Sequence, residues 1–472
     1  SATMLCMPGC EILQSFDLVH WEHVTYVYET LDHTDAQQLK SGQNIYGQGM
    51  WAASLRYHEG RFYICFVAND TRKTYLYTSE KIDGPWKKQL IEGFYHDGSL
   101  LFDEDGRNYI VYGNDEIWIT ELNEDLTAPK KDGLHRLLVS DHKNPELGYE
   151  GSHIQKINGY YYIFLIHSLR DRWMRTEACF YSDSLEGEFT GGDVLCDDRG
   201  YCGQGVAQGG IVDTPDGKWY AMLFQDSGAV GRIPILLPVT WKDHFPFFGQ
   251  NGHVPEEIEV HSTRPGYIYQ PLVGSDDFCN GLLPRWQFNH DPDPRYYHLD
   301  ALQGTYTITT REVCTELTQA VNTLTQRMSY PSCAAEVTVD ASALKEGDVA
   351  GLCALQSCYA AVGITKHHGK YEVLMLDKKE DGILDMTEGT VVESHQMDFR
   401  LEADFCNMKD EARCYYRVNK GDWLPIGTVH KLYFKLDHFT GCRFGLFCYA
   451  AEETGGSACF RDFKYYDVDE IS

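Results

Sequence analysis

The sequence predicts an all-β protein: a five-bladed β-propeller over residues 1–245, a linker at 246–273, and a β-sandwich of jelly-roll type over 274–472. Three observations predict this fold class. Four similar repeats follow one another in the first half, their spacing is typical of propeller blades, and the second half has strands without that repeat. A chain of 472 residues also exceeds what one hydrophobic core normally serves, so two domains are expected.

Each repeat contains a short apolar strand, a turn at a glycine and an aromatic-rich returning strand. The repeats begin at Ala52, Asp97, Glu150 and Gln208 and turn at Gly60, Gly106, Gly159 and Gly217. Glycine supplies the positive φ that tight hairpin turns need, and aromatic residues favour strands. Equivalent positions in successive repeats lie 45, 53 and 58 residues apart. Blades of four strands recur at about 40 to 50 residues before loop insertions.

A second signature favours four strands in each unit. It begins with Ser15, Ser79 or Ser182 and ends six or seven residues later in an aromatic residue. Residues 1 to about 45 contain only the later strands of such a unit, so we expect the first blade to lack its opening strand. The alternative is an ordinary β-sandwich with coincidental turns, but sandwiches rarely repeat a turn and its flanking residues in register.

The second half of the chain has a different pattern. A connector with four prolines joins the two halves. Short segments beyond it alternate apolar and polar residues, as strands with one buried face do, for example at 305–310, 334–339, 371–376 and 431–436. These segments predict the sandwich.

Composition excludes several classes of partner. The formal net charge of −29 would repel nucleic acid and acidic membranes, and a neutral substrate is easier to reconcile with it. No run of 18 apolar residues predicts a membrane span. The 16 cysteines lack the spacing of a zinc site, so we expect mostly reduced thiols and a cytoplasmic setting.

Two repeats carry a carboxylate at their first position, Asp97 and Glu150. This position begins the innermost strand of a blade, so both side chains should point into one funnel. A pair of carboxylates at one pocket is what glycosidic cleavage needs, with one acting as a proton donor of raised pKa. We expect Glu150 to be this acid and Asp97 to be the anionic neighbour that raises its pKa.

Longer motifs resemble a known family. The runs Tyr95-His-Asp-Gly-Ser-Leu-Leu-Phe-Asp-Glu-Asp-Gly, Tyr149-Glu-Gly-Ser-His and Gly231-Arg-Ile-Pro-Ile-Leu-Leu-Pro are similar to glycoside hydrolase family 43, in particular to its two-domain β-xylosidases and α-L-arabinofuranosidases. The resemblance extends into the second domain through Trp286-Gln-Phe-Asn-His-Asp-Pro.

The resemblance implies an inverting exo-hydrolase that requires no cofactor and releases terminal xylose or arabinose from xylo-oligosaccharides or arabinoxylan fragments. Glu150 matches the family's general acid, and Asp97 matches its pKa-modulating aspartate. Arg232 matches an arginine that reaches toward the axis, and Trp51 matches an aromatic pocket wall. Which pentose is preferred stays open.

The sequence departs from the family in two places. The family's general base, in an Asp-Pro motif on the first strand of the first blade, is missing, and Asp17 belongs to a repeated structural turn. We therefore expect impaired hydrolysis, or alternatively a catalytically silent carbohydrate-binding protein. Gln208 stands close to where many members have a histidine that helps to hold a metal ion or water. Its amide would bind a sugar hydroxyl or a neighbouring blade, and a bound structural calcium is possible but cannot be inferred.

Each candidate residue also has a purely structural interpretation. Asp97 would cap a turn, and Glu150 would be a solvated residue at a strand end. Trp51 would pack in the core, and Arg232 would pair with an acidic neighbour.

Overall fold

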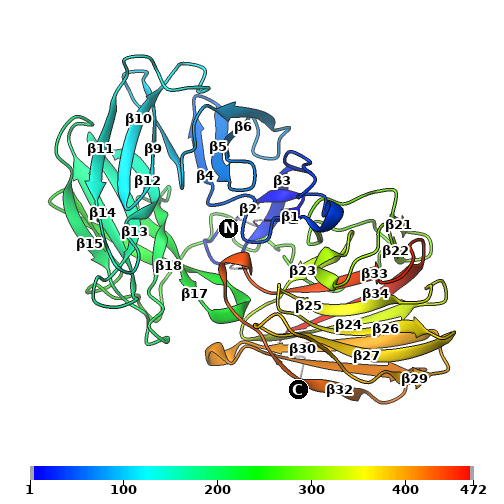
Figure 1. Ribbon diagram of the computed structural model, residues 1–472. Helices are drawn as coiled ribbons and strands as arrows, with labels where there is room; N and C mark the ends of the chain where they lie inside the picture. Colours follow the sequence, from blue (N-terminus) through cyan, green and yellow to red (C-terminus); the bar gives the residue numbers. More distant parts are fainter. Residues whose placement is uncertain (1–4, 439, 468–472) are drawn as a thin grey trace.

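The computed structural model describes residues 5–438 and 440–467, and four sheets of four antiparallel strands dominate its first half (Figure 1). In chain order these are β4 (Ser54–His58), β5 (Arg61–Ala68), β6 (Lys73–Ser79) and β7 (Lys87–Ile91); β8 (Ser99–Phe102), β9 (Asn108–Asn114), β10 (Glu116–Leu122) and β11 (His135–Ser140); β12 (Glu150–Ile157), β13 (Tyr160–Ser168), β14 (Arg175–Ser182) and β15 (Thr190–Leu195); and β16 (Ala207–Asp213), β17 (Trp219–Asp226), β18 (Arg232–Lys242) and β19 (Phe245–Phe248).

These sheets form a propeller-like arrangement. The first strands β4, β8, β12 and β16 contact one another in succession, so they lie around a common centre. The four turn glycines have φ values of 80° to 85°, as the repeat pattern predicted. Aromatic residues of the second and third strands, such as Tyr75, Tyr109 and Tyr162, are buried between the sheets.

A separate two-stranded sheet precedes these four sheets and contains β2 (Gly9–Gln14) and β3 (Glu22–Tyr28). The described residues thus form four complete blades, and a five-bladed propeller stays a prediction. Asp17 lies in the turn between β2 and β3, where its Oδ1 accepts the backbone N–H groups of Val19 (2.9 Å) and His20 (2.7 Å). This residue therefore stabilises a turn, as its repeated context indicated.

Two sheets face each other in the second half. The larger contains β1 (Cys6–Met7), β20 (Gln287–Asn289), β23 (Leu324–Arg327), β33 (Arg443–Ala450), β25 (Asp348–Leu355), β26 (Ala360–His367), β27 (Lys370–Lys378), β28 (Leu384–Met386) and β29 (Thr390–Val392). The smaller contains β21 (Tyr297–Asp300), β22 (Thr305–Thr309), β34 (Ser457–Asp467), β24 (Ser332–Asp340), β30 (Gln396–Asp404), β31 (Glu411–Val418) and β32 (Leu424–Lys431). One large apolar cluster fills the space between them. Short 3₁₀ helices are η1 (Lys40–Gly42), η2 (Gly228–Val230), η3 (Leu317–Gln319), η4 (Cys406–Met408) and η5 (Leu436–His438).

The structure corrects two predicted boundaries. Cys6 and Met7 do not form a blade strand but pair with β20 in the larger sheet of the second domain; residues 1–4 lie outside the described part. The last propeller strand extends to Phe248 and includes Pro246, which was assigned to the linker. Proline is tolerated there because β19 is an edge strand and one side needs no N–H donor.

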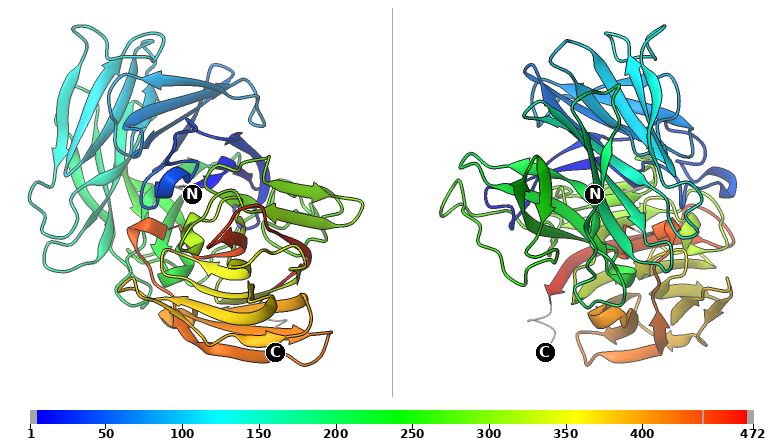
Figure 2. Two further views of the ribbon diagram at one scale, coloured as in Figure 1. Left: turned by 45° about the vertical axis from the view of Figure 1, so that its right-hand side comes forward. Right: turned by 90° about the vertical axis from the view of Figure 1, so that its left-hand side faces the viewer.

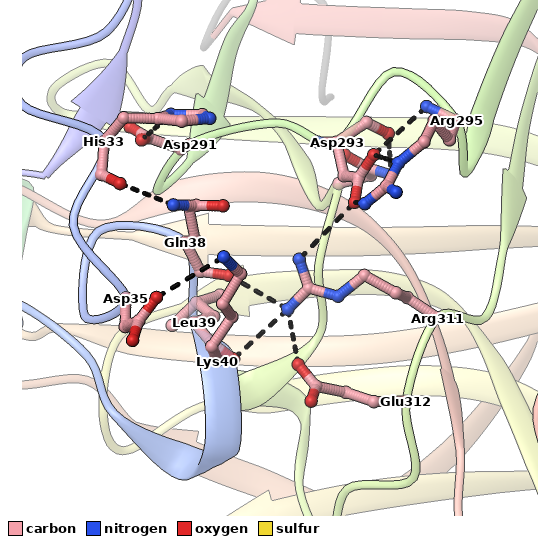
Figure 3. Close-up of polar contacts among 11 residues, drawn as sticks. His33, Asp35, Gln38, Leu39, Lys40, Asp291, Asp293, Arg295, Arg311 and Glu312 are labelled. Carbon is pink, nitrogen blue, oxygen red and sulfur yellow. Dashed lines mark hydrogen bonds and ion pairs between the residues drawn. The ribbon is translucent and has the colours of Figure 1, made fainter.

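The propeller and the sandwich are joined by a polar network (Figure 3). Arg311 of the sandwich, whose side chain is 10% exposed, donates to the carbonyl oxygens of Gln38 (3.0 Å) and Leu39 (3.4 Å) and lies 3.8 Å from Asp293. His33 Nδ1 lies 2.6 Å from Asp291 Oδ2. These contacts, and the views in Figure 2, place the sandwich against one side of the propeller.

All sixteen cysteines lie in the described part and carry free thiols, as predicted. Within the described ranges, no helix has the length and apolarity needed to cross a membrane.

Candidate active site

Asp97 lies just before β8 in a left-handed backbone conformation, with φ of 48°. Its Oδ2 accepts the backbone N–H of Gly151 at 3.0 Å, and its carbonyl oxygen accepts the hydroxyl of Ser152 at 2.7 Å. The residue is therefore fixed to the next blade by two hydrogen bonds. Its side chain is 5% exposed, and burial raises its pKa to about 6. His96 opposes this shift, whereas the charge of Glu150 adds to it.

Glu150 is the first residue of β12, and its side chain is 20% exposed. The strand pairing is interrupted by a bulge between Glu150 and His153, and bulges of this kind turn a side chain away from the regular alternation. Asn114 Nδ2 donates to Glu150 Oε2 at 2.7 Å. The carboxylate is thus oriented by a neighbouring blade and stays accessible from solvent.

His96 connects the two carboxylates. Its Nε2 lies 3.7 Å from Asp97 Oδ2 and 3.7 Å from Glu150 Oε2. Burial disfavours charge on the ring, but the nearby carboxylates of Glu150 and Asp97 outweigh it and raise the pKa of His96. The ring centroid lies 5.6 Å from that of the half-buried Trp51. The structure therefore brings Trp51 into contact with the carboxylate pair through His96.

Gln208 and Arg232 approach the pair from the last blade. Gln208 has φ of 59°, its backbone N–H donates to Glu177 Oε2 at 2.7 Å, and its side chain packs over Gly151. Arg232 starts β18, with Nε 3.3 Å from Asp226 Oδ1. Burial lowers the pKa of Arg232 to about 10, and the charges of Glu150 and Asp97 oppose that shift. Both residues therefore lie next to the carboxylates. Arg232 also pairs with an acidic neighbour, Asp226, which is the structural role considered for it from the sequence.

The sandwich fixes the position of Arg232. The carbonyl of Ala229 accepts the N–H of Cys442 at 2.8 Å, and the N–H of Ala229 donates to Asp410 Oδ1 at 3.1 Å. Helix η2 is thereby held against the sandwich immediately before Arg232. Placement of this guanidinium depends on the second domain as much as on the propeller.

A cavity of about 400 Å³ adjoins the cluster, a volume typical of ligand sites. Gln208 and Arg232 line it, whereas Asp97 and Glu150 are not among its lining residues. Residues 10–13 of β2 form one side in unbroken succession, so an edge of the two-stranded sheet borders the cavity. Arg327 and Thr440 close another side, as expected if the sandwich shapes the pocket.

Several residues of this site were not predicted from the sequence. His96 directly precedes Asp97, and Asn114 is the last residue of the aromatic strand β9. Arg175 forms an ion pair with Asp226, and its positive charge also interacts with Glu150. In the sequence, Arg175 stands two residues after Trp173 at the end of a loop rich in arginine, and this position was the only signal for it. In the structure, its guanidinium lies 5.2 Å from the Trp173 ring.

One group of described residues has ligand atoms close enough for a metal ion: His96, Asp97 and Glu150, all within 4.8 Å. One oxygen of each carboxylate already accepts a hydrogen bond from a protein N–H group. The hydrogen-bonded oxygens fit a pair of acid–base groups, whereas Asp97 Oδ1 and His96 Nε2 are buried without a hydrogen-bond partner among the described residues. We assign no ion to this group.

Comparisons with known proteins identify a family for each half of the chain. Residues 2–246 match the family model "Glycosyl hydrolases family 43", and residues 275–466 match "Beta xylosidase C-terminal Concanavalin A-like domain". A beta-xylosidase of Formosa agariphila is 25% identical, with 98% of this chain and 84% of that protein covered.

Two solved structures are also similar. One, described as a bifunctional GH43-CE protein of Bacteroides eggerthii, is 41% identical with a TM-score of 0.91; all of this chain is covered, but it spans only 61% of that protein. The other is an engineered GH43 enzyme described as having endo-xylanase and exo-arabinofuranosidase activity. It is 27% identical with a TM-score of 0.85, and 99% of this chain and 95% of that chain are covered. The chain belongs to glycosyl hydrolase family 43.

Proposed function

We propose that the protein is an exo-acting, inverting glycosidase that releases terminal xylose or arabinose from xylan or arabinoxylan oligosaccharides. The observation that carries this proposal is the pair Asp97 and Glu150, held on neighbouring blades with His96 Nε2 3.7 Å from each. The names of the similar proteins support a pentose substrate. The cavity beside the pair is bounded by the sandwich, which suits binding of a chain end.

Glu150 is the proton donor in this proposal. It is the more exposed of the two carboxylates, so it can reach the glycosidic oxygen, and Asn114 fixes one of its oxygens. Asp97 is buried and accepts a backbone N–H, so it orients its neighbour and supplies negative charge. Trp51, Gln208 and Arg232 bind the sugar ring around them.

Inversion also needs a base that activates water about 6.5 to 9.5 Å from the acid. The family resemblance places this base on the opening strand of the first blade, and no Asp-Pro motif occurs in residues 1–245. We therefore propose that hydrolysis by the chain as printed is weaker by about 10²- to 10⁴-fold, the usual contribution of a general base. The border between β2 and the cavity is a suitable place for such a strand.

The test compares the chain as printed with a version carrying an added N-terminal strand that includes an Asp-Pro motif. Both are incubated with p-nitrophenyl β-xyloside and α-L-arabinofuranoside. Release by the extended version, lost again on Glu150→Gln, is the expected result. Release by neither version would contradict the proposal.

A second candidate function is binding of carbohydrate without hydrolysis. The cavity favours this function, because Gln208 and Arg232 line it and can bind a sugar even where no base activates water. Calorimetric titration with xylo-oligosaccharides distinguishes the two functions. Binding by both versions, with no release of p-nitrophenol from either, would establish this alternative.

A further inference from the structure

A second cavity lies at the opposite end of the last propeller sheet from the carboxylates. It measures about 510 Å³ and is lined by the start of β17, the end of β18, Gln250 and residues 257–259. Asp226, which pairs with Arg232, ends β17, whereas Trp219 starts it. Seven residues of extended chain separate them, or about 23 Å. This cavity is therefore distinct from the candidate active site.

Two tryptophans form its apolar wall. The rings of Trp219 and Trp241 have centroids 5.4 Å apart and an interplanar angle of 77°, an edge-to-face pair. Both side chains are half-buried and line the cavity. Trp241 also packs edge-to-face on Tyr162 at 5.2 Å, so its ring is fixed from behind. Trp219 belongs to the hairpin end and is the more peripheral ring of the pair.

One polar atom in this wall has no partner. Trp241 Nε1 is buried, and within the described part of the chain it makes no hydrogen bond. A buried indole N–H usually donates to something, because leaving it unpaired costs about 1 to 3 kcal/mol.

Polar side chains surround the aromatic wall. Lys218, Gln250, Glu257 and Glu259 are exposed and line the cavity. The hydroxyl of Tyr220 donates to the carbonyl of Glu259 at 3.4 Å, which ties this segment to the sheet. The rim therefore offers a cationic donor, an amide and two anionic acceptors around flat apolar surfaces.

This combination selects a class of ligand. A polyanion is disfavoured by the two glutamates and by the net charge of −29. A wholly apolar ligand would remove the rim groups from water without replacing their hydrogen bonds. A neutral sugar has C–H faces that pack on indole rings and hydroxyl groups that bond to carboxylates and amides.

We propose that the Trp219 cavity is a secondary binding site for a neutral polysaccharide, with Trp219 as the stacking residue. It holds a chain on the surface while the active site acts on an end. The choice of arabinoxylan as the polysaccharide rests on the proposed function. The inference that the cavity binds a neutral sugar does not depend on that function.

The test is electrophoresis in native gels with and without soluble arabinoxylan, which requires no hydrolysis. The wild-type chain should be retarded by the polysaccharide, and Trp219→Ala should lose most of this retardation, leaving only the part that comes from the active site. We expect the apparent Kd to rise at least about tenfold. Trp219→Phe, which keeps a ring, should retain part of the retardation. Trp118→Ala is the matched control, because Trp118 is also half-buried on a blade but stacks on His135.

Glu150→Gln in the same gels separates this proposal from the proposed function. It should be retarded as strongly as the wild type, whatever its activity on aryl glycosides. Unchanged retardation of Trp219→Ala, or no retardation of the wild type, would overturn the proposal. If Trp219→Ala does not fold by circular dichroism, Trp219→Leu and the rim variant Glu257→Ala, each expected to reduce retardation, decide the outcome.

Discussion

His96 Nε2 lies 3.7 Å from Glu150 Oε2, and the same atom lies 3.7 Å from Asp97 Oδ2. A raised pKa keeps the imidazole charged over a wider pH range, so it screens two carboxylates that would otherwise repel each other. The three side chains come from two neighbouring blades. Their protonation is therefore coupled.

Removing the imidazole should change the pH dependence of activity. We expect His96→Gln to shift the acidic limb of the kcat/KM profile upward and to lower kcat/KM about tenfold, because the pKa of Asp97 rises once the positive charge is lost. The profile is measured on aryl glycosides with the strand-extended version. His135→Gln, a histidine stacked on Trp118 far from the carboxylates, is the control. An unshifted profile for His96→Gln would show that the imidazole is only a packing element.

Asp97 should reduce stability at neutral pH. Its folded-state pKa of about 6 lies above the usual 3.8, so the folded protein holds this proton more tightly than the unfolded chain. The contribution is fully present below about pH 4 and is lost as the pH rises through about 6. Asp97→Asn should therefore increase the free energy of unfolding at pH 7 to 8 by on the order of 2 kcal/mol relative to its effect at pH 4. Urea unfolding at both pH values measures this, and an equal effect at both would refute it.

Two arginines on one aspartate offer a matched test of the domain interface. Arg311 and Arg295 both contact Asp293, but the Arg311 side chain is 10% exposed and that of Arg295 is 76% exposed. Arg311→Ala should cost about 3 kcal/mol, because it leaves the carbonyls of Gln38 and Leu39 without their donor. Arg295→Ala should cost less than about 1 kcal/mol.

Calorimetry distinguishes these outcomes. Arg311→Ala should also separate the unfolding of the two domains into two transitions, while Arg295→Ala leaves the wild-type thermogram. Equal small losses would mean that the domains are held together elsewhere.

Gly151 should be required for the position of Gln208. It has φ of 66°, and a Cβ there would lie 2.6 Å from Gln208 Nε2. Gly151→Ala should therefore displace this amide and weaken oligosaccharide binding, in addition to a backbone cost of about 1 kcal/mol or more. Gly159→Ala is the control, since Gly159 has φ of 85° but nothing within 4 Å of an added Cβ. Calorimetric titration should show weaker binding for Gly151→Ala alone.

Much of the architecture was predictable because its signals are local. Each hairpin is marked by a glycine that adopts a positive φ, at Gly60, Gly106, Gly159 and Gly217. The aromatic strands next to these glycines indicate buried sheets. The repeat register then placed Asp97 and Glu150 on adjacent inner strands. That two carboxylates meet at one centre followed from repetition alone.

Other features arise only when distant segments meet. Cys6 and Met7 pair with Gln287–Asn289, and a two-residue strand has too few side chains to specify a partner nearly three hundred residues away. Arg175 reaches Asp226 and Arg232 only because blades pack side by side and the sandwich holds helix η2. The sequence by itself determined the repeating sheets and the two acids, since φ preferences and strand alternation act within a few residues. The tertiary structure decided the histidine between the acids, the arginine pair and the cavities, because charge interactions and packing depend on distance in space.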